Sequence, residues 1–198
     1  MPATFNYPIF LDVTTRPILI VGGGAVAVRK AKALLDAGAT NITCISPAFH
    51  RDLPDSVKRV QAEYDEKHLA GVSLVFAATN AGEVNDALVR DAGRRGILVN
   101  RVDDSDTTGD FTTAATHRNG SITLAVGAGG NPTVAAAVRD AFAAQFDPRW
   151  TALNDAVGQL RTELKDSPNR VSLLRKASSA EAMEVFAKSG LSGLRDWL

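Results

Sequence analysis

Three consecutive glycines, Gly22, Gly23 and Gly24, have the spacing in this chain that most clearly points to chemistry. They follow the apolar run 18–21 and, with Ala27, fit the pattern G-x-G-x-x-G/A, in which a strand turns sharply into a helix. Such a turn lets the backbone approach a pyrophosphate, and the helix N-terminus directs N–H groups toward its charge. A tight turn without a ligand is the alternative. We favour a dinucleotide site because a strand precedes the glycines and a helix follows them.

The segment after the glycines has the periodicity of a helix over 25–37. We expect the main-chain N–H groups of Ala25 and Val26, at the start of this helix, to complete the pyrophosphate site. Arg29 and Lys30 add positive charge to the same helix, although a solvated helix face explains this basic pair at least as well.

A second contact to the dinucleotide is expected where the strand 41–45 ends in Ser46 and Pro47. An NAD site usually has Asp or Glu there, about 20 residues after the glycines, to bind a ribose hydroxyl. The missing carboxylate weakens the argument for NAD over NADP. Because no arginine stands at the strand end to bind a 2′-phosphate, although His50 and Arg51 are close in sequence, we predict NAD as the cofactor.

The most apolar strand, 72–78, ends in Ala78, Thr79 and Asn80. We expect these residues near the nicotinamide side of the cofactor, because ligands of open α/β sheets lie at the carboxyl ends of the strands. Capping of the following helix, 83–94, is an equally good interpretation of Thr79 and Asn80.

A polar, turn-rich segment with four aspartates, 103–110, follows the buried strand 97–100. It lies on the carboxyl-end side of the predicted sheet, so its carboxylates are candidates for proton transfer to or from a ligand. For any one aspartate in such a loop, a turn or cap role is the usual explanation.

Strands and helices alternate through the first half of the chain, with a weaker strand at 57–61. This order predicts an α/β fold, a Rossmann-like, mostly parallel sheet with helices on both faces. After about residue 110 the rhythm changes to a short run at 111–113, a strand at 121–126 and a helix at 133–146. We therefore predict a dinucleotide-binding domain over 1–110, a small α+β unit over 111–146 and a helical C-terminal region over 147–198.

Composition limits the classes of partner. The 198 residues carry 22 Lys and Arg against 22 Asp and Glu, so no overall basic charge favours nucleic acid or a membrane surface. No segment approaches the length of an apolar membrane-spanning helix, and we expect no secretory leader. The only cysteine, Cys44, lies in an apolar strand; a core position in a cytoplasmic protein is the plain interpretation.

Several motifs in one order resemble the precorrin-2 dehydrogenase family, which includes the amino-terminal module of siroheme synthases. They are Tyr7-Pro8-Ile9-Phe10-Leu11, the glycine turn with Arg29-Lys30, Ser46-Pro47, Ala77-Ala78-Thr79-Asn80 with Val84-Asn85, Asn100-Arg101-Val102-Asp103, and Gly109-Asp110-Phe111. The resemblance covers about residues 7–146. The chain departs from the family pattern at Ala114, where proline is usual, and in the turn 127–132, which is usually rich in serine.

This resemblance implies the NAD-dependent oxidation of precorrin-2 to sirohydrochlorin, a step toward siroheme or a cobalamin. It implies that Asp103 is the catalytic base, with its neighbour Asp104 as the alternative, and that Ser46 contacts the ribose. Some members also insert ferrous iron at the same site, and the sequence leaves open whether this chain does so. Members are typically homodimers, in which the small middle unit exchanges contacts between subunits.

A tetrapyrrole with several carboxylates needs cationic partners, and the nearest candidates to the motifs are Arg101, His117, Arg118 and Arg139. The three histidines of the chain lack the spacing of a metal site, so we predict none. An NAD(H)-binding sensor domain without catalysis has the same expected fold and is the alternative function.

Overall fold

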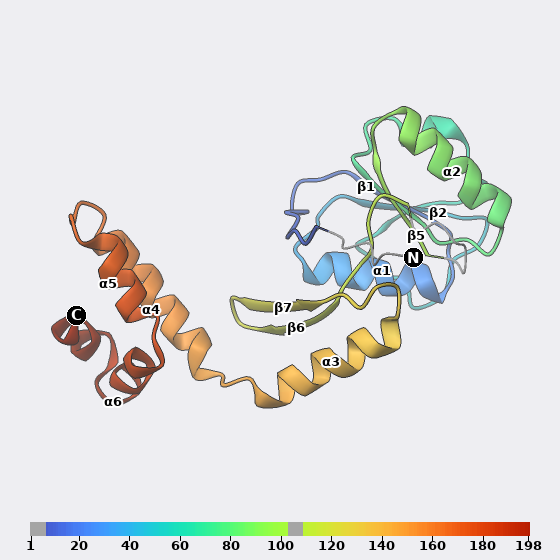
Figure 1. Cartoon of the computed structure of the whole chain (residues 1–198). Coiled ribbons are helices and arrows are strands. Elements are labelled where there is room, and N and C mark those ends of the chain that lie inside the picture. Colours follow the sequence, from blue (N-terminus) through green and yellow to red (C-terminus); the bar gives the residue numbers. More distant parts are fainter. Residues whose placement is uncertain (1–6, 103–108) are drawn as a thin grey trace. The chain divides into compact units, whose positions relative to one another are not determined.

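A computed structural model describes residues 7–102 and 109–198 (Figure 1). The chain forms two compact units, and the break between them falls between Thr113 and Ala114. Each unit is described by itself below. Within residues 7–102 and 109–198, no helix is long and apolar enough to cross a membrane.

The first unit contains a five-stranded parallel sheet in the order β3-β2-β1-β4-β5. Its strands are β1 (Ile18–Val21), β2 (Ile42–Ile45), β3 (Lys58–Val60), β4 (Leu74–Ala77) and β5 (Leu98–Arg101). All four residues of β1 and of β4 are buried, as expected for central parallel strands covered on both faces. The chain returns from β3 to the other side of β1, which creates a switch point between β1 and β4.

Helices cover both faces of this sheet (Figure 1). Helix α1 (Ala25–Asp36) shares one apolar core with Ile18 and Ile20 of β1, whereas α2 (Gly82–Arg94) shares the other with Leu19 and Val21. The alternation of strand side chains divides the apolar residues between the two faces. A short 3₁₀ helix, η1 (Glu66–Leu69), precedes β4. The predicted fold class is confirmed.

The second unit has a hairpin of β6 (Ala115–Asn119) and β7 (Ile122–Val126), followed by helix α3 (Pro132–Gln145). Three further helices follow: α4 (Arg149–Glu163), α5 (Arg170–Ala177) and α6 (Ala180–Trp197). Leu153 and Leu160 of α4 and Leu194 of α6 form the centre of their apolar core. The helical tail is thus as predicted, while the division at residue 146 into two separate domains stays a prediction.

Two local features of the structure were not apparent from the sequence. The run 111–113 is not a strand, because Phe111 turns into the core beside α1 and packs edge-on against Phe76 at 5.7 Å between ring centroids. The strand β6 was missed because its alternating residues are polar or half-buried. The two-residue loop Gly120-Ser121, with Gly120 at φ +54°, is a hairpin signal that could have located it.

Candidate functional site

The glycine turn lies at the carboxyl end of β1, against the neighbouring strand ends. Gly22 has φ +117°, and a Cβ built on it would lie 2.2 Å from the Ala78 carbonyl oxygen; one built on Gly23 would lie 2.0 Å from the Ala48 carbonyl oxygen. No other residue fits either position. A Cβ on Gly24 would meet nothing within 4 Å, so this glycine faces open space.

Open space in front of Gly24 coincides with an uncapped helix end. Gly24 is the N-cap of α1, no side chain caps the helix there, and its first turn contains no acidic residue. Ala25 is exposed and Val26 half-buried at this end. The free N–H groups at such a helix end attract an anion, and the first turn of α1 has no carboxylate that would repel one. The glycine turn with Ala25 and Val26 therefore fits the diphosphate of a dinucleotide.

The loop after β2 is joined to the same turn. The His50 N–H donates to the Gly23 carbonyl at 2.7 Å, and Ser46 Oγ lies 2.7 Å from the position of a Cβ on Gly23. The Pro47 carbonyl accepts from Gln61 Nε2 at 3.1 Å. Ser46 thus stands beside the proposed diphosphate position. The carboxylate next along the chain, that of Asp52, lies 3.7 Å from His50 Nδ1.

The end of β4 packs on the other side of the glycine turn. The Ala78 N–H donates to the Val21 carbonyl at 2.8 Å, and Thr79 N would lie 3.0 Å from a Cβ on Gly22. Helix α2 has Ala81 as its N-cap and no side-chain cap, so the capping interpretation of Thr79 and Asn80 was wrong. Asn80 is exposed. The structure thus brings the predicted residues of β1, β2 and β4 together at one sheet edge.

The end of β5 completes this edge. The Val102 N–H donates to the Ala77 carbonyl at 3.0 Å, and the chain returns at Gly109, which bridges to Asn100. Asp110 is held at the returning end, where its Oδ2 accepts from the Val99 N–H at 2.9 Å. Asp103 and Asp104, the alternative bases, lie outside the described residues.

Arg101 is not a solvated cation. It is buried in β5, and its guanidinium forms a charge-assisted hydrogen bond to the Asp86 carboxylate of α2. A role in substrate binding would compete with this ion pair. Asn100 precedes Arg101 in β5. Its Nδ2 donates to the Phe111 carbonyl at 2.7 Å, while its buried Oδ1 has no hydrogen-bond partner.

The environment of the Lys30 ammonium could not be predicted from the sequence. The sequence left open a solvated face for it, but its ammonium lies 5.5 Å from the Phe76 ring centroid and donates to Thr113 Oγ1 at 2.8 Å. Burial, reinforced by the charge of Arg29, lowers the pKa of Lys30 to about 8. Cys44 is buried as expected; burial raises the pKa of its thiol to about 11, and Sγ donates to the Gly22 carbonyl at 3.2 Å.

The remaining cationic candidates lie in the second unit. His117 and Arg118 are on β6, where the His117 ring packs edge-on against Phe146 and its buried Nε2 has no hydrogen-bond partner. Arg139, on α3, is paired with the adjacent Asp140 at 2.7 Å. Nothing in the described residues gathers three or more His, Cys, Asp or Glu side chains in a geometry that could hold a metal ion.

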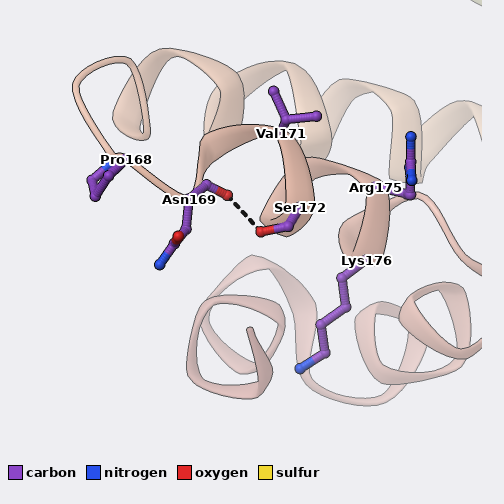
Figure 2. Close-up of a pocket in the computed structure, with 6 residues that line it drawn as sticks. All are labelled: Pro168, Asn169, Val171, Ser172, Arg175 and Lys176. Carbon is purple, nitrogen blue, oxygen red and sulfur yellow. Dashed lines mark hydrogen bonds between the residues drawn. The ribbon is translucent and has the colours of Figure 1, made fainter.

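A shallow hollow on α5 is a separate feature of the second unit. Figure 2 shows the side chains that line it, Pro168, Asn169, Val171, Ser172, Arg175 and Lys176. Ser172 Oγ donates back to the Asn169 carbonyl at 2.9 Å, and Lys176 donates to the Trp197 carbonyl at 2.6 Å. Two of its polar groups are thus satisfied within the protein.

Comparison with known proteins places this geometry in a family. The siroheme synthase 1 of Aeromonas salmonicida is 35% identical over 164 residues, which are 80% of this chain and 35% of that protein. The siroheme synthase of Chromobacterium violaceum is 40% identical over 139 residues, which are 67% of this chain and 29% of that protein. The chain therefore spans about a third of the length of these curated relatives.

A solved structure described as SirC, precorrin-2 dehydrogenase, has the same fold, with a TM-score of 0.78, 21% identity, and coverage of 97% of this chain and 98% of that one. The two siroheme synthases agree with the family resemblance of the sequence motifs, and the solved structure agrees with the predicted fold. The model of a family described as "Putative NAD(P)-binding" matches residues 9–115, the segment that contains the glycine turn and all five parallel strands. The chain belongs to this NAD(P)-binding family.

Proposed function

We propose that the chain is an NAD-dependent precorrin-2 dehydrogenase, which oxidises precorrin-2 to sirohydrochlorin in siroheme or cobalamin biosynthesis. The observation that carries the proposal is the sheet edge at the switch point, where an uncapped helix end, a glycine turn without room for side chains and the end of β4 lie in contact. Because the sequence relatives are named siroheme synthases, they support a tetrapyrrole as the class of substrate.

In this proposal Gly22, Gly23 and Gly24, with the N–H groups of Ala25 and Val26, bind the diphosphate, and Ser46 and Pro47 lie at the adenosine ribose. The turn of Ala78, Thr79 and Asn80 faces the nicotinamide. NAD, when bound, supplies the acceptor for a hydride from the substrate. Arg101, His117, Arg118 and Arg139 remain candidates for the substrate's carboxylates, with Arg101 the least available because of Asp86.

Asp103 is the proposed base. It follows Val102, whose N–H is bonded to the Ala77 carbonyl at the carboxyl edge of β4. The oxidation removes one hydride and one proton from precorrin-2; bound NAD⁺ would be the acceptor for the hydride, and the Asp103 carboxylate takes the proton. Asp104 is the alternative base and provides a matched control, since it is the same residue type one position further along the chain.

The test is a spectrophotometric assay of NADH formation with precorrin-2, using the wild type, Asp103→Asn and Asp104→Asn. We expect Asp103→Asn to reduce kcat by roughly 100-fold or more, the usual loss on removing a general base, with an unchanged Kd for NAD. Activity that survives in Asp103→Asn and disappears in Asp104→Asn would move the base by one residue. A wild type that binds NAD without turnover would instead support the sensor function.

The proposal includes a homodimer in which the unit 111–146 forms the contact. Val134, Val138 and Phe142 recur at every fourth position of α3 and are 47%, 37% and 60% exposed, an apolar stripe on one face of the helix. A cytoplasmic location belongs to the same proposal, since the chain's only cysteine is a buried free thiol.

A further inference from the structure

Asn85, which the glycine pattern does not include, is a polar side chain with 0% exposure in the first turn of α2. A buried carboxamide requires hydrogen-bond partners, because it has lost its contact with water. Asn85 finds several of them in a single residue, Thr79. Its Oδ1 accepts from Thr79 Oγ1 at 2.7 Å and from the Thr79 N–H at 3.4 Å, and its Nδ2 donates to the Thr79 carbonyl at 3.0 Å.

These hydrogen bonds fix the turn that leaves β4. Both backbone polar groups of Thr79 and its hydroxyl are bound to one side chain, and the same hydroxyl accepts from the Ala81 N–H at 3.2 Å. The polar groups of Thr79 are therefore engaged within the protein. Its part in the site is to hold the backbone of the turn in one conformation.

The fixed turn also touches the glycine turn directly. A Cβ on Gly22 would meet the Ala78 carbonyl oxygen at 2.2 Å and Thr79 N at 3.0 Å, so the two turns are in van der Waals contact. A continuous path of contacts therefore runs from Asn85 through Thr79 to Gly22. Because packed groups do not deform freely, moving the β4 turn would disturb this path.

The order of the strands in the sheet indicates which half of a bound dinucleotide would lie beside the β4 turn. In folds of this kind the adenosine ribose binds at the end of the strand on one side of β1, which is β2 here. Strand β4 lies on the other side of β1. The β4 turn thus faces the nicotinamide half. We infer that Asn85 is a positioning residue, which holds the β4 turn in the conformation that receives the nicotinamide half of NAD; this inference rests on the proposed function.

The experiment separates the two halves of the cofactor. Kd values for NAD and for ADP, which lacks the nicotinamide and its ribose, are measured by calorimetry on the wild type and on Asn85→Leu. Leucine keeps a similar volume and removes every hydrogen bond to Thr79. We expect the Kd for NAD to rise about tenfold or more and the Kd for ADP to change by less than about twofold.

Leu88→Ala is the matched control. Leu88 lies on the same helix, is also 0% exposed and belongs to the core beneath α2. Its substitution destabilises the fold without removing a bond to Thr79, so the ratio of the two Kd values should stay at the wild-type ratio. If Asn85→Leu does not fold, Asn85→Asp keeps the acceptor for Thr79 but replaces the donor by a carboxyl oxygen that faces the Thr79 carbonyl, so it should shift the ratio in the same direction.

The possible failures are distinct. Equal weakening of NAD and ADP in Asn85→Leu, or in Asn85→Asp if only that variant folds, would overturn the inference and leave Asn85 a structural residue. A ratio that changes equally in Leu88→Ala would overturn it as well. A wild type that binds neither NAD nor ADP would overturn the proposed function itself, because then the glycine turn holds no diphosphate.

Discussion

At the scale of single residues, burial changes the chemistry of Lys30. Its ammonium lies against the Phe76 ring and is bonded to Thr113 Oγ1 rather than surrounded by water. Burial penalises the charged form, so the pKa falls from 10.5 to about 8. Below pH 8 the half-buried ammonium is charged in the folded protein, which then bears the cost of its partial desolvation. Between pH 8 and 10.5 the unfolded chain binds more protons than the folded one, so the contribution of Lys30 to stability increases with pH.

A comparison with Lys30→Met measures this effect. We expect the free energy of unfolding of the wild type, relative to Lys30→Met, to rise by on the order of 2 kcal/mol between pH 7.5 and pH 10. Urea unfolding at both pH values provides the measurement. Lys32→Met is the control, because Lys32 is an exposed lysine of the same helix. A free energy of unfolding, relative to Lys30→Met, that stays constant between these two pH values would contradict a partly desolvated charge at Lys30.

At the scale of elements, the junction of β1 and α1 contains one glycine that the fold requires and another that ligand binding requires. Gly22 is required by its φ of +117° and by the Ala78 carbonyl, whereas Gly24 has an ordinary φ of −84° and open space around it. We expect Gly22→Ala to lose a few kcal/mol of stability. Gly24→Ala should lose about 1 kcal/mol or less, yet raise the Kd for NAD at least tenfold, because its methyl group occupies the approach to the helix N-terminus.

Thermal unfolding and calorimetric titration with NAD test both substitutions on the same samples. Gly24→Ala that binds NAD as tightly as the wild type would show that the diphosphate lies elsewhere. Gly22→Ala with wild-type stability would contradict the close approach of β1 and β4. The pair thus distinguishes a glycine that the fold needs from one that the ligand needs.

The same elements show how far the sequence could predict the structure. Parallel strands buried on both faces are continuous apolar runs, so β1, β2 and β4 were evident, as was the turn after β1. The half-exposed strand β6 has no such run. The ion pair of Arg101 with Asp86 joins residues 15 positions apart, and the contact of Lys30 with Thr113 spans 83 positions. Tertiary contacts of this kind leave no local pattern.

At the scale of the whole molecule, the described residues of the dinucleotide site all come from the first unit. The second unit carries an exposed apolar surface on α3. Every fourth residue of α3 from Val134 to Phe142 is a large exposed hydrophobic side chain. Exposed apolar side chains grouped in this way are uncommon on monomeric proteins and typical of interaction surfaces. A second copy of the chain would bury this stripe against an equivalent one, as in a two-fold symmetric interface.

Introducing a charge into this stripe tests the homodimer. For the wild type at micromolar concentration, light scattering should give about twice the chain mass of 20.9 kDa. Phe142→Asp should shift the mass to that of one chain, since burying an unpaired carboxylate in an apolar interface costs several kcal/mol. Val171→Asp is the control, because Val171 is 74% exposed but lies on α5. A monomeric wild type, or a dimer that persists in Phe142→Asp, would rule out α3 as the contact, whereas dissociation by Val171→Asp alone would assign the interface to α5.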